Sequence, residues 1–210
     1  MLTKESGILY CFAKAPWKKY TFSDLKKETK KKSKSYLALT IKRFLKEDII
    51  LQELIGKLPV YSLNIHSAKA RAFAGFVLEH NGWRSKHVPY TDLEKVLQKI
   101  PAKGFVFLIA GSYAKNSQTK ESDIDAVIIV DDALNTKGIY ALLAHTCEMN
   151  IPPIHLYVFK SKEFKGMLLS KEANYGKEIA AHSLILYGGQ MYIALLAEAM
   201  DRGFSGKHIY

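Results

Sequence analysis

The sequence predicts an α/β domain over residues 101–210, preceded by a small helical domain over residues 1–66 that ends in a β-hairpin. Two observations support this fold class. Three continuous apolar runs of strand length, Phe105–Ala110, Ile124–Val130 and Ile154–Phe159, are separated or followed by helical segments, which is the pattern of strands buried on both faces. The chain has 210 residues, 48% of them hydrophobic, which is enough for one large domain or two small ones.

The first domain is expected to contain three helices followed by two strands. Apolar residues recur at helical spacing in three segments, and two later runs of β-forming residues flank a turn. The expected elements are a helix around Ile8–Phe12 that Pro16 ends, a short helix capped by Thr21 or Ser23, a helix over Ser35–Glu47, and strands over Ile49–Leu54 and Pro59–Leu63 with a turn at Ile55–Leu58. This order resembles that of a winged helix-turn-helix domain, although no diagnostic motif accompanies it.

Two further helices, within residues 67–100, are expected to join the domains. One covers Ser67–His80 and ends at an Asn-Gly pair. The other covers Thr91–Lys99, where Thr91 and Glu94 stand at the spacing of a capping box.

Several classes of protein are excluded by composition. No run of 18 or more apolar residues occurs, so no membrane-spanning helix and no membrane partner are expected. The first ten residues lack the pattern of a secretory signal. The two cysteines, Cys11 and Cys147, are far apart and do not have the spacing of metal ligands. A reduced, cytoplasmic location is therefore expected.

The basic charge of the chain is concentrated in its first half. The net charge is +11, and residues 1–66 carry 14 Lys and Arg against 6 Asp and Glu, whereas residues 101–210 carry 11 of each. Such asymmetry favours contact with a polyanion. A lysine-rich, solvated surface without a partner is the alternative.

A chemical motif stands between the first two strands of the second domain. Gly111 and Ser112 follow the first strand, and Asp123 and Asp125 mark the start of the second. A glycine lets backbone amides approach a phosphate closely, and the serine adds a hydroxyl donor. Two aspartates two residues apart on a strand lie on one face, where both can bind Mg²⁺ together with substrate phosphates. The alternative is a structural loop with two solvated aspartates.

This motif resembles that of the nucleotidyltransferase superfamily of the DNA polymerase β type, particularly its minimal members. An apolar strand, Gly111-Ser112, ten residues and Asp123-Ile124-Asp125 reproduce the family's pattern, and Lys115 matches a basic position after Gly-Ser. The resemblance implies a mixed sheet, a nucleoside triphosphate as substrate and Mg²⁺ or Mn²⁺ as cofactor. It also implies that Lys115 meets the charge of the triphosphate. The segment Tyr175–Ile179, followed by Leu184–Gly188 and a terminal helix to about Asp201, resembles the tail of members that carry an N-terminal winged helix.

Two positions depart from the family pattern. Asn116 stands where the family's Gly-Ser-x-Ala-Lys/Arg-Gly segment ends in glycine, and a third carboxylate is missing. Members normally place a third carboxylate on a later strand, but the strand Ile154–Phe159 contains no Asp or Glu, and His155 stands in the corresponding place. A neutral histidine can ligate a metal or act as a base. Alternatively, His155 has no catalytic role and transferase activity is weak or lost.

The basic first domain offers a candidate face for DNA or RNA. In a winged helix the third helix enters the major groove, and lysines before it can meet phosphates. The candidate residues are Lys30, Lys31, Lys32, Lys34, Tyr36, Lys42, Arg43 and Lys46. The alternative is a module for protein interaction or homodimerisation with a basic, soluble face.

Three functions therefore compete. The first is a Mg²⁺-dependent enzyme that transfers a nucleoside monophosphate to a hydroxyl of a protein, a nucleic acid or a small molecule. The second is a winged-helix DNA-binding regulator whose transferase domain senses nucleotide or is inactive. The third is an antitoxin-like role with a partner protein.

Overall fold

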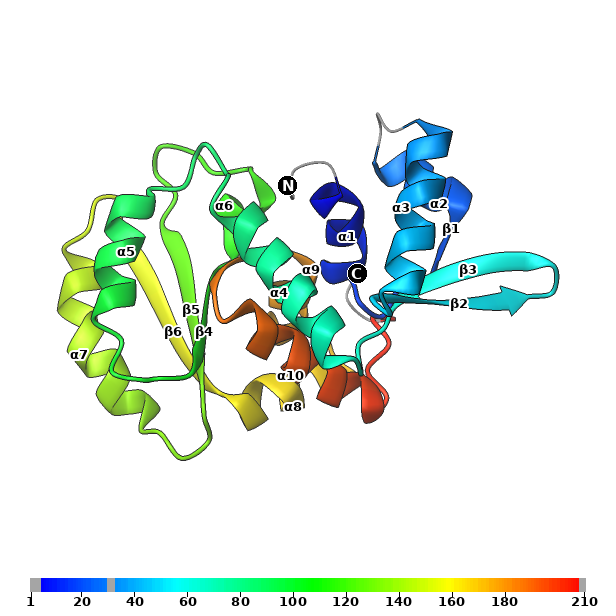
Figure 1. Ribbon diagram of the computed structural model, residues 1–210. Helices are drawn as coiled ribbons and strands as arrows, with labels where there is room; N and C mark the ends of the chain where they lie inside the picture. Colours follow the sequence, from blue (N-terminus) through cyan, green and yellow to red (C-terminus); the bar gives the residue numbers. More distant parts are fainter. Residues whose placement is uncertain (1–4, 30–32, 208–210) are drawn as a thin grey trace.

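The computed structural model describes residues 5–29 and 33–207. Its first part contains helices and strands in the expected order, with one addition (Figure 1). The elements are α1 (Ser6–Ala13), β1 (Tyr20–Thr21), α2 (Phe22–Glu28), α3 (Lys34–Lys46), β2 (Ile50–Ile55) and β3 (Leu58–Leu63). Strand β1 was not predicted, because two residues are too few to show alternation in a sequence.

Local capping explains where the helices of this part begin. The Thr21 hydroxyl accepts a hydrogen bond from the backbone N–H of Asp24 at 3.1 Å, which confirms Thr21 as the cap of α2. Ser33 caps α3 in the same way. The three strands form an antiparallel sheet in the order β1-β3-β2. The strands extend to Ile55 and from Leu58, so the turn is shorter than predicted.

The second part contains a mixed sheet, as predicted, with a fourth strand in addition to the three that the sequence predicted. Its strands are β4 (Phe105–Ile109), β5 (Ile124–Val130), β6 (Ile154–Lys160) and β7 (Leu184–Tyr187), in the order β6-β5-β4-β7. Strands β5 and β6 are parallel, and the other pairs are antiparallel. Strands β4 and β5 are buried on both faces, whereas β6 lies at the edge and alternates between buried and exposed positions along its first half.

Helices cover both faces of this sheet (Figure 1). On one face lie α5 (Tyr90–Gln98) and α7 (Thr136–Glu148). On the other lie α4 (Ala68–Gly82), α8 (Ser161–Leu169), α9 (Tyr175–Ala181) and α10 (Gly189–Asp201), with the short α6 (Gly111–Lys115) at the end of β4. Helix α5 follows Pro89 and has no side-chain cap, so the predicted capping by Thr91 is wrong.

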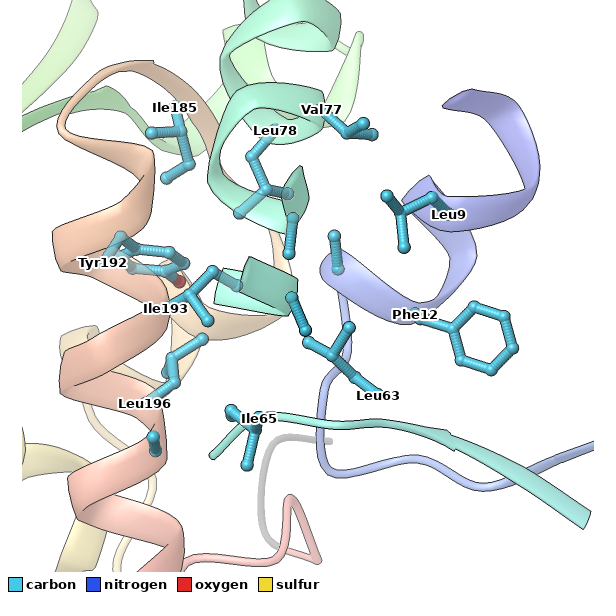
Figure 2. Packing of buried hydrophobic residues seen from close by; sticks show 14 of the residues in the cluster. Leu9, Phe12, Leu63, Ile65, Val77, Leu78, Ile185, Tyr192, Ile193 and Leu196 are labelled. Atoms are coloured by element: carbon cyan, nitrogen blue, oxygen red, sulfur yellow. The ribbon is translucent and has the colours of Figure 1, made fainter. Parts of the chain in front are cut away.

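One hydrophobic core connects the two parts of the chain. Figure 2 shows Leu9 of α1 facing Val77 of α4, and places Phe12 of α1, Leu63 of β3 and Ile193 of α10 in the same buried cluster. Helix α4 packs against α1, α10 and β7 together. The domain limits at residues 66 and 100 remain a prediction, but the segment between them includes a central helix of the core.

Two other expectations concern membranes and cysteines. Among the residues that the structure describes, no helix is long and apolar enough to cross a membrane. Cys11 and Cys147 are buried free thiols, and burial raises the pKa of Cys147 to about 11.

The close crossing of α4 and α10 depends on two glycines. A Cβ atom at Gly75 would lie 2.3 Å from the backbone N of Gln190, and one at Gly189 would lie 2.4 Å from the carbonyl oxygen of Gly75. Side-chain atoms do not approach backbone atoms so closely, so the two helices can reach this separation only with glycine at both positions.

Replacing Gly75 with alanine is expected to lower the free energy of unfolding. Alanine gains about 1 kcal/mol of helix propensity, but the forced separation of α4 and α10 is expected to cost roughly 1–3 kcal/mol. Gly166→Ala is the control, because its Cβ would have no atom within 4 Å on the exposed side of α8. Denaturant unfolding should show Gly75→Ala destabilised and Gly166→Ala unchanged or stabilised. Equal behaviour of the two variants would contradict the packing argument.

Candidate functional site

The two aspartates of the motif lie at the start of β5. Asp123 precedes the strand, Asp125 is its second residue, and Ile124 between them is fully buried. Alternation along the extended chain therefore directs both carboxylates to the same face, as the sequence predicted. Their side chains are 38% and 26% exposed, so both remain accessible from solvent.

The glycine of the motif lies directly against the second aspartate. Because β4 and β5 are antiparallel with Ile109 opposite Ala126, the end of β4 meets the beginning of β5. Gly111 has a φ of +63°, and a Cβ there would lie 2.0 Å from Oδ2 of Asp125. No other residue type fits this position without displacing the carboxylate. The backbone at Gly111 and the carboxylate of Asp125 are therefore in direct contact.

His155 lies beside both aspartates. The parallel pairing of β5 and β6 places it opposite Asp125. Its Nε2 is 3.3 Å from Oδ2 of Asp123, and its Nδ1 is 3.9 Å from Oδ1 of Asp125. The imidazole thus lies beside the paired acids, and its equivalence to the family's third carboxylate stays a prediction.

Lys115 and Glu178 form an ion pair next to these groups. Lys115 Nζ is 2.6 Å from Oε1 of Glu178 on α9. Burial raises the pKa of Asp125; His155 lowers it, the charges of Glu178 and Asp123 raise it, and Lys115 lowers it. Glu178 therefore belongs to the electrostatic surroundings of the carboxylates. The sequence motif contained no signal for it, since it lies more than fifty residues after Asp125.

An aromatic wall continues the site along β6. It consists of Tyr157 and Phe159, which follow His155 on the same face of the strand, and Tyr175 at the start of α9. The rings of Tyr157 and Tyr175 are 4.8 Å apart, and those of Phe159 and Tyr175 are 6.3 Å apart. The Tyr175 hydroxyl is buried and has no hydrogen-bond partner among the described residues, and burial raises its pKa. Sequence reasoning missed this wall.

A cavity opens beside the histidine at the edge of the sheet. Its volume is about 460 Å³, and His155, Tyr157 and Tyr140 are among the residues that line it. An open cavity at this edge gives a second molecule access to His155.

The donor set of the site consists of two carboxylates and one imidazole. Within the described part of the chain, no group of three or more His, Cys, Asp or Glu residues is arranged to hold a metal ion. Two carboxylates are nevertheless the oxygen donors that Mg²⁺ and Mn²⁺ prefer, and Mg²⁺ commonly takes its other ligands from phosphates and water. The residues therefore fit a metal that arrives with a phosphorylated ligand.

The candidate nucleic-acid residues are only partly described. Lys30, Lys31 and Lys32 lie outside the described residues. Lys34, Lys42 and Lys46 are exposed on or at the start of α3. Arg43 is paired with Glu5, its Nη1 lying 3.1 Å from a carboxylate oxygen. Tyr36 is partly buried against the core.

The fold and the paired carboxylates beside a glycine-serine loop define a class of protein that handles phosphorylated ligands. Comparison with protein families identifies that class: the model described as "Nucleotidyltransferase domain" matches residues 76–184, which include the loop, both aspartates and His155. The chain belongs to this family, whose members generally use divalent metal ions.

Two other comparisons add little detail. A solved structure described as "Crystal structure of the toxin-antitoxin with AMP-PNP" is similar over 55% of this chain and 86% of that chain, with 16% identity and a TM-score of 0.42. The search among curated proteins found no match.

Proposed function

We propose that the protein transfers a nucleoside monophosphate from a metal-bound nucleoside triphosphate to a hydroxyl group. The observation that carries this proposal is the contact of Gly111 with Asp125, with Asp123 beside them. A phosphate held by this backbone would otherwise lie beside two negatively charged carboxylates, which would repel the phosphate. A divalent cation between the carboxylates and the phosphates resolves the conflict, and it also offsets the penalty that burial places on the charged form of Asp125.

Each residue of the motif has a role in this proposal. Asp123 and Asp125 bind the metal, either Mg²⁺ or Mn²⁺, through oxygen. Gly111 and Ser112 contact phosphate oxygens through the backbone and the hydroxyl. Lys115 exchanges Glu178 for the charge of the triphosphate.

The reaction forms a bond between the acceptor oxygen and the α-phosphorus, and it breaks the bond between that phosphorus and the oxygen leading to the β-phosphate. Pyrophosphate leaves, and the acceptor hydroxyl loses its proton. When bound, the metal neutralises phosphate charge and lowers the pKa of the attacking hydroxyl. His155 is the group placed to receive the proton, if it has a catalytic role. The acceptor can be a protein side chain, a nucleic acid or a small molecule.

The aromatic wall favours a substrate that contains a flat aromatic ring. Tyr157 is 37% exposed, follows His155 on β6, and its ring contacts that of the partly buried Tyr175. A nucleobase or an aromatic acceptor can stack on such a ring. The unpartnered Tyr175 hydroxyl offers a hydrogen-bond donor to the same ligand.

The double substitution Asp123→Ala with Asp125→Ala is expected to abolish metal-dependent binding of nucleoside triphosphate. Both side chains lie at the exposed start of β5, so the melting temperature should change little. Asp131→Ala is the control, because this residue stands just after the other end of the same strand. Calorimetry with each triphosphate, with and without Mg²⁺ or Mn²⁺, measures the effect. Undiminished metal-dependent binding by the double variant would eliminate the proposed site.

Substitutions at His155 are expected to distinguish a weakened site from one with a catalytic histidine. If the histidine replaces a missing acid, His155→Asp adds a negative charge that holds the metal, and nucleotidyl transfer should rise by roughly 10²–10³-fold. His155→Ala should then change transfer little. The measurement is transfer from labelled triphosphate to protein or RNA with Mn²⁺ or Mg²⁺. Robust transfer by the parent that is lost in His155→Ala would instead assign the proton-accepting role to His155.

A second candidate function is a nucleic-acid-binding regulator whose transferase domain senses nucleotide. The exposed lysines Lys34, Lys42 and Lys46 favour it, because none has an acidic partner within 4.0 Å in the described part of the chain.

The tip of the β2–β3 hairpin favours binding of a protein instead. Leu54, Ile55 and Leu58 there are 66%, 59% and 52% exposed, and apolar side chains suit a protein partner or a second copy better than a phosphate backbone.

Charge reversal on α3 is expected to show whether this helix binds nucleic acid. In Lys42→Glu with Lys46→Glu, affinity for duplex DNA or RNA should fall and the slope of log affinity against log salt should drop by about two, because two phosphate contacts are lost. Lys103→Glu with Lys137→Glu, on the α/β domain, is the charge-matched control. Fluorescence anisotropy over a salt series measures both. If the two pairs reduce affinity equally, α3 is not the nucleic-acid face.

A further inference from the structure

A second cluster of charged residues surrounds a cavity away from the paired aspartates. The cavity has a volume of about 240 Å³ and lies between the end of α8, the start of α9 and the segment that follows α10. Four cations line it: Lys171, Lys177, Arg202 and Lys207. Among the described residues, no Asp or Glu lines it. None of the four forms an ion pair within the described residues, in contrast to Lys115 and Lys165 of the same domain.

Lys177 is the buried member of this cluster. It is 3% exposed, and its ammonium donates hydrogen bonds to the backbone carbonyls of Ser170 and Glu172. Carbonyl dipoles satisfy two of its three donors but do not neutralise its charge. Buried lysines are normally paired with an acid, so an uncompensated positive charge is held at the base of this cavity.

The walls of the cavity are fixed parts of the fold. The side chain of Asn174 accepts a hydrogen bond from the Lys177 backbone at 3.1 Å and donates one to the Met167 carbonyl at 2.8 Å, which holds the loop before α9. On the opposite side the Phe204 ring packs edge-on against Trp17, with centroids 5.1 Å apart. Gly206 lies so close to Trp17 that a Cβ there would be 2.2 Å from the indole nitrogen.

Nearby acids do not supply the missing charge. Asp201 precedes Arg202, but its carboxylate faces His66 at 3.6 Å. Glu172 contributes its backbone carbonyl to Lys177, and its exposed side chain does not line the cavity. Residues 101–210 have no net charge, so this gathering of cations is a local feature and not a consequence of a basic domain.

We propose that this cavity binds a phosphate group. A phosphate carries up to two negative charges and several acceptor oxygens, which match three lysines and the forked guanidinium of Arg202 better than a single carboxylate does. Hydroxyls of Ser170 and Ser205 also line the cavity. The group can belong to a small phosphorylated molecule or to the phosphodiester of a nucleic acid. The site requires neither the aspartates nor a metal, so it is independent of the proposed transferase function.

The test uses the full chain with Asp123→Ala and Asp125→Ala, in buffer containing EDTA, so that the motif site does not contribute. Inorganic phosphate and pyrophosphate are titrated by calorimetry, and a labelled single-stranded oligonucleotide is titrated by anisotropy. Adding Lys171→Glu and Arg202→Glu should weaken binding about tenfold or more, since charge-assisted hydrogen bonds are lost. Adding Lys103→Glu should not. Both reversed residues are exposed, and melting curves check the fold.

Each outcome decides the question. Binding of the inorganic anions that is lost on charge reversal supports the site and identifies a free phosphate as sufficient. Binding of the oligonucleotide alone, lost in the same way, supports the site and identifies the nucleic-acid backbone as the source. Binding that charge reversal leaves unchanged, or no binding of any probe, overturns the proposal, whatever the result of the nucleoside triphosphate experiments.

Discussion

The parallel pairing of β5 with β6 is the constraint on which the site depends. It places His155 opposite Asp125, while the antiparallel pairing of β5 with β4 brings Gly111 against the same carboxylate. Strand β5 is therefore the common reference for all the groups of the motif. Its side chains are buried from Ala126 to Val130 between two hydrophobic clusters, one on each face. A strand packed in this way cannot slip by one residue without moving Asp125 into the core and Ile124 out of it.

The sequence predicted most of the fold that surrounds the motif, because a strand that is buried on both faces consists of a continuous run of apolar residues. Ile124–Val130 has the predicted bounds, and the Gly111 and Asp125 positions follow from spacing. It did not predict Glu178, Tyr157 or Tyr175 as neighbours of the aspartates. Tyr157 lies on β6, two residues after His155. The proximity of Glu178 and Tyr175 results from how α9 packs on the sheet, and that packing depends on contacts between residues far apart in the chain. The wrong capping of α5 has a local cause: the helix begins at Tyr90, directly after Pro89, so Thr91 already lies within its first turn.

The shared core gives the N-terminal elements a fixed relation to the transferase domain. Leu9 and Phe12 belong to the same buried cluster as Val127 and Ile129 of β5, and Gly75 and Gly189 let α4 and α10 approach closely in its centre. A winged-helix module connected by a flexible linker would not share a core with the sheet. Whatever the first 66 residues bind, such a partner is held at a defined distance from the carboxylates. The apolar hairpin tip extends away from this core (Figure 1).

The ion pair between Lys115 and Glu178 sets the electrostatic cost of bringing a triphosphate to the motif. Both side chains are close to 40% exposed, and ion pairs of this kind contribute about 0–1 kcal/mol to stability. Lys115 can therefore leave Glu178 for a phosphate at little cost. Once it leaves, the negative charge of Glu178 is no longer compensated, and this charge already raises the pKa of Asp125. Under the proposed function, the site without Lys115 needs a divalent cation more strongly, so metal and triphosphate are expected to favour each other's binding. That reciprocal coupling is a property of three charged side chains from α6, β5 and α9, and it requires no movement of the backbone.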